Sequence, residues 1–96
     1  MGWTPALRIL SVAPTDDFKL VVGWTDGSTR LFDPMPLVRG SFMGRLCDSA
    51  YFKRVRVTPN AVSVEWPEGQ DFAPETLYER SAVLGAPPCA SRAASL

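Results

Sequence analysis

Residues 18–33, FKLVVGWTDGSTRLFD, are the clearest indication of the fold that we expect of this chain. Two apolar runs flank Asp26-Gly27, and Asp-Gly between apolar runs is the strongest short-range signal for a β-hairpin. A two-residue type I′ loop at this dipeptide pairs Val22 with Leu31. In that register one face, which we expect to face the core, carries Phe18, Leu20, Val22, Trp24 and Leu31.

A strand precedes this hairpin and a second hairpin follows it. Residues 7–13 form an apolar run that stops at Pro14, as a short strand does. Residues 54–66 read as two strands around the loop 58–61, where Pro59 excludes a type I′ turn because proline cannot take a positive φ. A four-residue loop places the valines on one face and the polar side chains on the other, with Arg54 opposite Glu65 and with Arg56 and Ser63 beside them.

Two short helices complete the predicted fold. The first spans about residues 48–53 with Asp48 as a candidate N-cap, and the second spans about residues 74–84 with Pro74 in its first turn. The fold class is therefore α+β, with an antiparallel sheet built from two hairpins plus an N-terminal strand. The chain divides into an N-terminal arm (residues 1–6), a single α+β domain (residues 7–84) and a flexible tail (residues 85–96).

The composition limits the chemistry that the chain performs. Its 96 residues include no histidine and two cysteines. Without imidazole there is no Ser-His or Cys-His pair, and two distant thiols do not make a zinc pattern. We therefore expect no catalytic residue, no metal and no cofactor, and a protein that is not an enzyme.

The two cysteines leave two alternatives open. Cys47 would be a nucleophile if Arg45 or Lys53 lowered the pKa of its thiol, but we expect a small buried or half-buried thiol. A disulfide between Cys47 and Cys89 is the second alternative, although a reducing cytoplasm is the simpler interpretation. Carboxylate pairs in the chain are typical of solvated turns and helix faces rather than of hydrolytic dyads.

The charges balance overall but not along the chain. Basic and acidic residues number 10 each, yet residues 39–58 carry five basic groups and one acidic group, and residues 59–80 carry one and five. Three of the basic residues lie together beside two aromatic residues. With one glutamate of the facing strand, they are our candidate partner-binding residues: Lys53, Arg54, Arg56 and Glu65.

Our leading hypothesis is a non-enzymatic interaction or regulatory domain that acts through a protein partner. Self-association, with the basic face on the acidic face of a second copy, is one form of it. The alternative is a weak nucleic-acid-binding module, in which the strand arginines contact phosphates and an aromatic ring stacks on a base. The third interpretation needs no partner: Arg54 pairs with Glu65 across the hairpin, and this face is simply exposed to solvent. Three tryptophans are many for so small a domain, and we expect Trp3 to be exposed.

The N-terminal residues do not resemble a signal peptide, because no basic region is followed by an apolar one. No apolar run approaches the roughly 20 residues of a membrane span. We therefore expect a cytoplasmic protein without membrane contact.

The segment from Trp66 to Glu79 carries a family resemblance. It reads WPEGQDFAPETLYE and resembles the W-P-N-G-x-D-x-x-P-x-x-L-Y pattern of a bacterial family, the domain of unknown function 2442 family. The matching residues are Trp66, Pro67, Gly69, Asp71, Pro74, Leu77 and Tyr78. Earlier landmarks that also match are Asp26-Gly27, Asp33, Pro36-Leu37, Phe42, Leu46, Asp48, Phe52, Val55 and Val57, so the resemblance covers about residues 7–80.

The resemblance implies a small α+β domain with an antiparallel sheet, and it carries over no catalytic or ligand-binding residue. The gene setting of such proteins resembles a toxin–antitoxin or regulatory pair, which implies an antitoxin-like or inhibitor component whose partner is a neighbouring-gene product. Glu68 stands where the family usually has Asn. We interpret the motif as structural, because Gly69 suits a turn and Pro74 suits a helix start.

Overall fold

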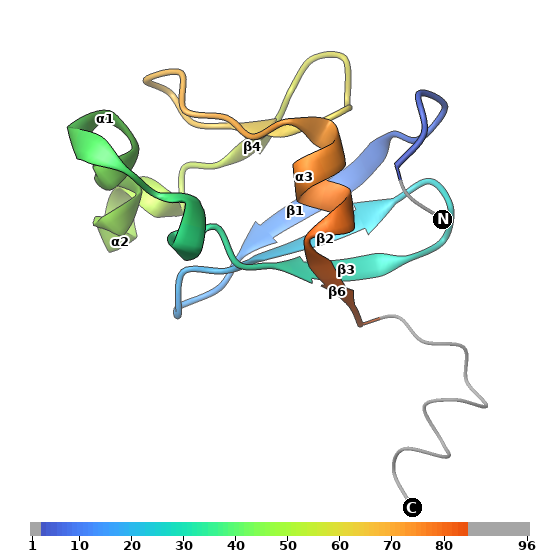
Figure 1. Cartoon of the computed structure of the whole chain (residues 1–96), viewed down its shortest axis with the longest axis horizontal. Coiled ribbons are helices and arrows are strands. Elements are labelled where there is room, and N and C mark those ends of the chain that lie inside the picture. Colours follow the sequence, from blue (N-terminus) through green and yellow to red (C-terminus); the bar gives the residue numbers. More distant parts are fainter. Residues whose placement is uncertain (1–2, 85–96) are drawn as a thin grey trace, which may run out of the picture.

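The computed structural model describes residues 3–84 and has the predicted α+β class (Figure 1). Its larger sheet is antiparallel, in the order β1 (Ile9–Pro14), β2 (Leu20–Trp24), β3 (Thr29–Phe32) and β6 (Ser81–Val83). A second sheet pairs β4 (Arg56–Val57) with β5 (Val64–Glu65). The helices are α1 (Gly40–Gly44), α2 (Ser49–Phe52) and α3 (Pro74–Glu79), with 3₁₀ turns η1 (Met35–Leu37) and η2 (Arg45–Cys47).

The first hairpin forms where it is predicted, but its register differs by one residue. Val22 lies opposite Arg30 rather than Leu31. The Trp24 N–H donates to the Ser28 carbonyl at 2.9 Å, so the loop has three residues, 25–27. Of Asp26 and Gly27, only Gly27 has a positive φ. A type I′ turn needs a positive φ at both central positions, which excludes it here. Phe32, 1% exposed, therefore takes the core position that we expected Leu31 to fill.

The second hairpin also slips relative to its predicted register. The Thr58 N–H donates to the Ser63 carbonyl at 3.0 Å, so the loop lies one residue further along the chain. As a result Arg56, and not Arg54, lies opposite Glu65. Ser63 is buried instead of solvated, and its hydroxyl donates to the Phe72 carbonyl. This hairpin forms a sheet of its own, which crosses above the larger sheet in Figure 1.

The second predicted helix is half as long as expected. Asp48 caps α2 as predicted, because its side chain accepts from the N–H groups of Ala50 and Tyr51. Helix α3, however, ends at Glu79, and the next residues form strand β6 along the free side of β3. The prediction of a helix to residue 84 is wrong, because the edge of β3 provides hydrogen bonds that one more helical turn would forgo.

The core lies between the larger sheet on one side and α3, the β4–β5 hairpin and the α2 region on the other. The buried apolar residues are Ile9, Leu20, Val22, Trp24, Phe32, Leu46, Tyr51, Phe52, Val64, Trp66, Phe72, Leu77 and Tyr78. Edge-on aromatic contacts connect the layers: the ring centroids of Trp24 and Tyr78 lie 5.0 Å apart, and those of Phe32 and Phe72 lie 5.2 Å apart.

Three further expectations concern Trp3, Cys47 and the disulfide to Cys89. Trp3 is half-buried and packs against the core, so the prediction of an exposed indole is wrong. Cys47 is an exposed free thiol rather than a buried one. Cys89 and the predicted tail 85–96 lie outside the described residues, so the disulfide stays a prediction. Within residues 3–84 no helix has the length and apolar character needed to cross a membrane.

Candidate functional site

Two of the three basic residues that the sequence singles out form ion pairs with carboxylates of the same chain. The Lys53 Nζ atom lies 2.9 Å from Asp16 Oδ1, and the Arg56 Nε atom lies 2.9 Å from Glu65 Oε2. Arg54 is exposed and, within residues 3–84, forms no ion pair. The expected pair of Arg54 with Glu65 is therefore wrong, because the slipped hairpin brings Arg56 to that carboxylate instead. Of these three cations, Arg54 alone stays without a carboxylate in the described part of the chain.

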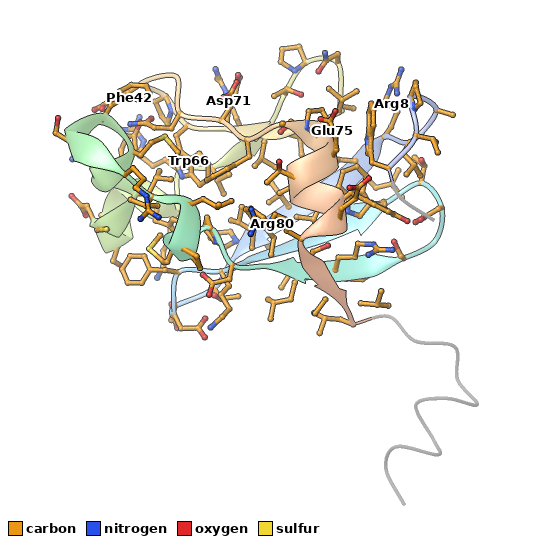
Figure 2. The ribbon with its side chains drawn as sticks, in the orientation of Figure 1. Arg8, Phe42, Trp66, Asp71, Glu75 and Arg80 are labelled. Carbon is orange, nitrogen blue, oxygen red and sulfur yellow. The ribbon has the colours of Figure 1, made fainter. Side chains whose placement is uncertain are left out.

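The family-like motif builds the interior and one turn rather than an open site. Trp66 is 1% exposed, and its indole N–H donates to the Phe52 carbonyl at 2.8 Å. The turn after it closes through Gly69, which has a φ of 104° that favours glycine. Figure 2 shows Trp66 inside the molecule and Phe42 on α1 at one end. The remaining motif residues are Pro67 and Asp71, which are exposed, Pro74, which begins α3, and the buried Leu77 and Tyr78.

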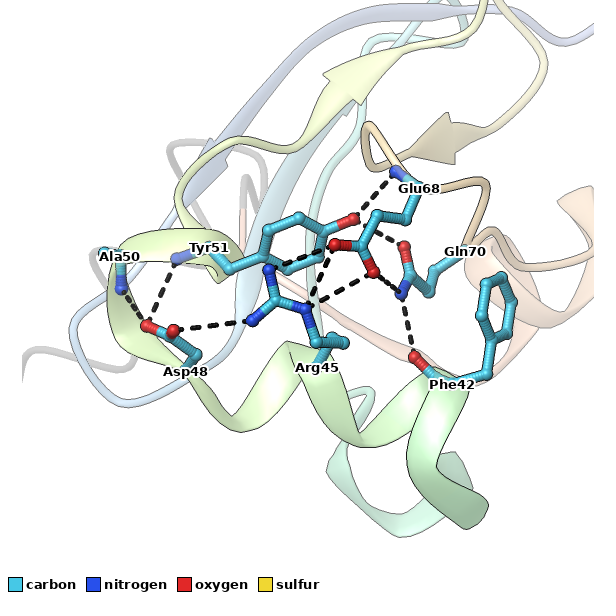
Figure 3. Close-up of polar contacts among 7 residues, drawn as sticks. All are labelled: Phe42, Arg45, Asp48, Ala50, Tyr51, Glu68 and Gln70. Atoms are coloured by element: carbon cyan, nitrogen blue, oxygen red, sulfur yellow. Dashed lines mark hydrogen bonds and ion pairs between the residues drawn. The ribbon is translucent and has the colours of Figure 1, made fainter.

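A buried amide connects this turn to two helices (Figure 3). Gln70 is 0% exposed, and its Oε1 atom accepts from the Tyr51 hydroxyl at 2.7 Å. The Gln70 Nε2 atom donates to the Phe42 carbonyl at 2.8 Å, so the same side chain also holds α1. The Tyr51 oxygen accepts in turn from the Glu68 N–H at 2.8 Å. Both polar atoms of the amide thereby have partners, as a buried amide requires.

A charged pair covers this network on its outer side. The Arg45 Nη2 atom lies 3.0 Å from Glu68 Oε2, and the guanidinium carbon lies 4.4 Å from the centroid of the Tyr51 ring. The hydrogen bond from Arg45 lowers the pKa of Glu68 below its usual value. Both side chains remain nearly half-exposed. A second carboxylate, that of Asp48, lies 3.7 Å from Arg45 Nη1, so the Tyr51 ring and two carboxylates hold the guanidinium in one orientation.

Phe42 completes this surface. Its ring is 54% exposed although its own carbonyl is fixed by the buried Gln70. We call Phe42, Arg45, Tyr51, Glu68 and Gln70 the α1 platform. In the sequence Phe42 is only a landmark, and nothing there joins Arg45 to Gln70, because the platform comes from separate segments that only the fold brings together. Of the predicted partner-binding residues, none belongs to the platform.

A shallow groove of about 660 Å³ lies on another side of the molecule. It is bordered by the loop of the second hairpin and by residues 71–74, and its lining includes Glu65 and Asp71. These two predicted residues are neighbours, because their backbones form an isolated antiparallel bridge. In residues 3–84 no group of three or more metal-ligating side chains is present. The groove therefore brings two carboxylates, those of Glu65 and Asp71, together at the surface.

A second polar cluster connects α3 to the first hairpin. The Tyr78 hydroxyl donates to Asp26 Oδ2 at 2.5 Å, and the Arg30 guanidinium lies 3.8 Å from the centroid of the Tyr78 ring. Burial raises the pKa of Asp26, but hydrogen bonds from Ser28 and Tyr78 outweigh it, and the pKa of Asp26 lies below its usual value. The cluster joins two motif regions, Asp26-Gly27 and Leu77-Tyr78.

The comparison with protein families confirms the family resemblance of the sequence. A family model described as protein of unknown function (DUF2442) matches residues 9–82, which is nearly all of the described fold. The chain belongs to the DUF2442 family. Searches of curated proteins and of solved structures find no match.

Proposed function

We propose that this DUF2442 domain is a non-enzymatic protein-interaction domain and that the α1 platform is its contact surface. The observation that carries the proposal is the exposed ring of Phe42 on a backbone fixed by buried Gln70. An exposed aromatic side chain normally loses conformational freedom on binding, and a rigid support reduces that cost.

The neighbours of Phe42 suit a protein partner. Aromatic residues and arginine are enriched at binding hot spots, where a few side chains supply most of the affinity. Arg45 lies three residues from Phe42 and is held on the Tyr51 ring, with nearly half of its side chain exposed. The platform thus combines an apolar anchor with a fixed cation that is already paired with two carboxylates, those of Glu68 and Asp48. A partner with an apolar pocket for the Phe42 ring and polar groups around it fits this chemistry.

The first candidate partner is the product of a neighbouring gene, because an antitoxin-like or inhibitory component would bind such a product. The experiment is co-expression of the full chain with that product, followed by affinity purification and titration calorimetry. The variant Phe42→Ala is expected to weaken binding at least about tenfold, which is typical of a hot-spot aromatic residue.

Leu10→Ala is the matched control, because Leu10 is even more exposed at 70% but lies on β1, outside the platform. It is expected to bind like the wild type. Equal affinity of the wild type and Phe42→Ala would contradict the proposal, and so would a complex that Leu10→Ala weakens as much. If the purified chain instead retains nucleic acid that Arg54→Ala releases, the alternative function is favoured.

A further inference from the structure

Strand β6 leaves one edge of the larger sheet open. It pairs with β3 on one side, with Leu31 opposite Ala82 and Phe32 opposite Ser81. In the sheet order β1-β2-β3-β6 it is the last strand, so its other side has no strand beside it in the described residues. Two large apolar side chains at this edge are exposed, Val83 at 53% and Leu84 at 49%.

The hydrogen bonds between β6 and β3 show which backbone groups of β6 face outward. The Leu84 N–H donates to the Thr29 carbonyl at 2.7 Å, and this pair continues the register of β3 and β6 by one residue. Hydrogen-bonded and non-hydrogen-bonded pairs alternate in an antiparallel ladder. Ala82 therefore also bonds inward, and the N–H and C=O groups of Ser81 and Val83 point away from β3 into the open edge.

The two edges of this sheet are built differently. Edge strand β1 carries a bulge between Ile9 and Ser11 and ends at Pro14, and its Ile9 N–H already donates to the Ala61 carbonyl at 2.6 Å. Bulges, prolines and covering loops are the devices that keep an edge from pairing with another chain. Strand β6 has neither proline, charge nor bulge in its sequence Ser-Ala-Val. Within the described residues its edge is therefore open to a further strand.

We propose that β6 is a self-association edge, at which a second copy of this chain adds its own β6 in antiparallel orientation. The two-fold axis passes between the two Ala82 residues, which face each other as a non-hydrogen-bonded pair. Ser81 then lies opposite Val83 of the partner subunit, and each such pair exchanges two N–H···O=C bonds. The result is one continuous eight-stranded sheet, since each copy contributes four strands.

Side chains and charge select this orientation. At the axis two small Ala82 side chains meet, where the Cα atoms of a non-hydrogen-bonded pair approach to about 4.5 Å. Arg80 precedes β6, and in the antiparallel arrangement it lies opposite Leu84 of the partner subunit. A parallel arrangement would instead place the two Arg80 side chains side by side, where like charges repel. The apolar Val83 and Leu84 side chains lose solvent exposure in the antiparallel dimer.

This surface is separate from the α1 platform, because α1 and β6 lie well apart on the molecule in Figure 1. The proposal therefore does not rest on the proposed function. A dimer through β6 leaves both copies of Phe42 accessible.

The decisive variant is Val83→Pro in the full chain, studied by sedimentation equilibrium over a wide range of concentration. Proline removes the outward N–H of Val83 and leaves the inward bonds to β3 intact, and proline is tolerated at a sheet edge in this position. The wild type is expected to reach twice the monomer mass as concentration rises, and Val83→Pro to stay at the monomer mass. Val83→Ala, which keeps the N–H, is the matched control and is expected to dimerise.

Two further measurements keep the proposal falsifiable if Val83→Pro does not fold. Ala82→Glu places two like charges at the axis and is expected to abolish the dimer, whereas Phe42→Ala is expected to leave it unchanged. The Val83 amide is expected to exchange more slowly with solvent hydrogen as concentration rises. A wild type that stays monomeric, a dimer that survives Val83→Pro, or a Val83 amide protected independently of concentration would each overturn the proposal.

Discussion

Gln70 is fully buried, and each polar atom of its amide has a hydrogen-bond partner. A buried donor or acceptor that loses its partner costs about 1–3 kcal/mol, so this network strongly favours one arrangement of α1, α2 and the motif turn. Glutamine is mostly exposed in proteins, and the sequence alone gives no sign that this one is buried. Only the proximity of Tyr51 and the Phe42 carbonyl explains it.

At the residue scale we predict that in Tyr78→Phe the free energy of unfolding depends less steeply on pH in the acid range. Burial raises the pKa of Asp26 in the folded state, but hydrogen bonds from Ser28 and Tyr78 lower it further than burial raises it. A lowered folded pKa stabilises the fold above the unfolded pKa of about 3.9, and this contribution is lost as the pH falls through the folded pKa. Without the hydroxyl, the folded pKa of Asp26 moves up and the loss of stability below about pH 4 becomes shallower.

Urea denaturation from pH 2 to pH 7 measures this effect. Tyr78→Phe is expected to lose about 1 kcal/mol at pH 7, as for one hydrogen bond. The control is Tyr51→Phe, whose hydroxyl donates to a neutral amide. It is expected to lower stability without changing the acid slope. An acid slope of Tyr78→Phe identical to the wild type would contradict the assignment.

At the element scale the first hairpin shows why a register cannot be read from a turn dipeptide alone. A two-residue loop and a three-residue loop both place glycine at a positive φ, so Asp26-Gly27 is compatible with each. The apolar pattern does not decide either, because Leu31 and Phe32 are both apolar and each register buries one of them. The side chain of Phe32 is larger than that of Leu31, and its ring packs on Phe72, a contact between distant segments.

We predict that Gly27→Ala destabilises the hairpin, because Gly27 has a φ of 87° that other residues adopt only with strain. The expected loss is about 1 kcal/mol in the free energy of unfolding, measured by thermal and urea denaturation. Gly44→Ala is the matched control, since Gly44 is helical, has a negative φ and has open space around its Cβ position. It is expected to be neutral or slightly stabilising. An equal loss in both variants would contradict the strain argument.

The segment 74–84 shows a second limit at this scale. Its composition favours a helix throughout, and Ser81-Ala82-Val83 has only one β-branched residue. The chain nevertheless leaves the helix at Arg80 and pairs with β3. Local propensity amounts to a few tenths of a kcal/mol per residue, so tertiary hydrogen bonds readily override it.

At the scale of the whole molecule the fold joins the basic and acidic segments of the sequence. Arg45 pairs with Glu68 and Arg56 pairs with Glu65, each pair connecting the basic segment to the acidic one. The internal pairing that stood as the alternative to a partner-binding face is thereby present, although with Arg56 in place of Arg54. Lys53 finds its carboxylate elsewhere, at Asp16.

From this pairing we predict that the full chain does not retard a DNA duplex at physiological salt in a mobility-shift titration. Each protein cation on a phosphate releases counterions, and affinity rises steeply with the number of such contacts. Of the three basic candidates, Arg54 is the one that forms no ion pair within residues 3–84. Glu65→Gln, which frees Arg56, is expected to increase weak retention at low salt. Strong, steeply salt-dependent binding by the wild type would support the nucleic-acid alternative instead.

Local patterns in the sequence were enough to predict the α+β class, the place of both hairpins, the Asp48 cap and the DUF2442 membership, because turn chemistry, capping and motif spacing are local properties of the chain. The tertiary structure sets the registers, the change from α3 to β6, and the ion pairs of Lys53 and Arg56. It also assembled the α1 platform from separate segments. These features depend on contacts between residues far apart in the sequence, whose packing energy exceeds the small local preferences that a sequence pattern expresses.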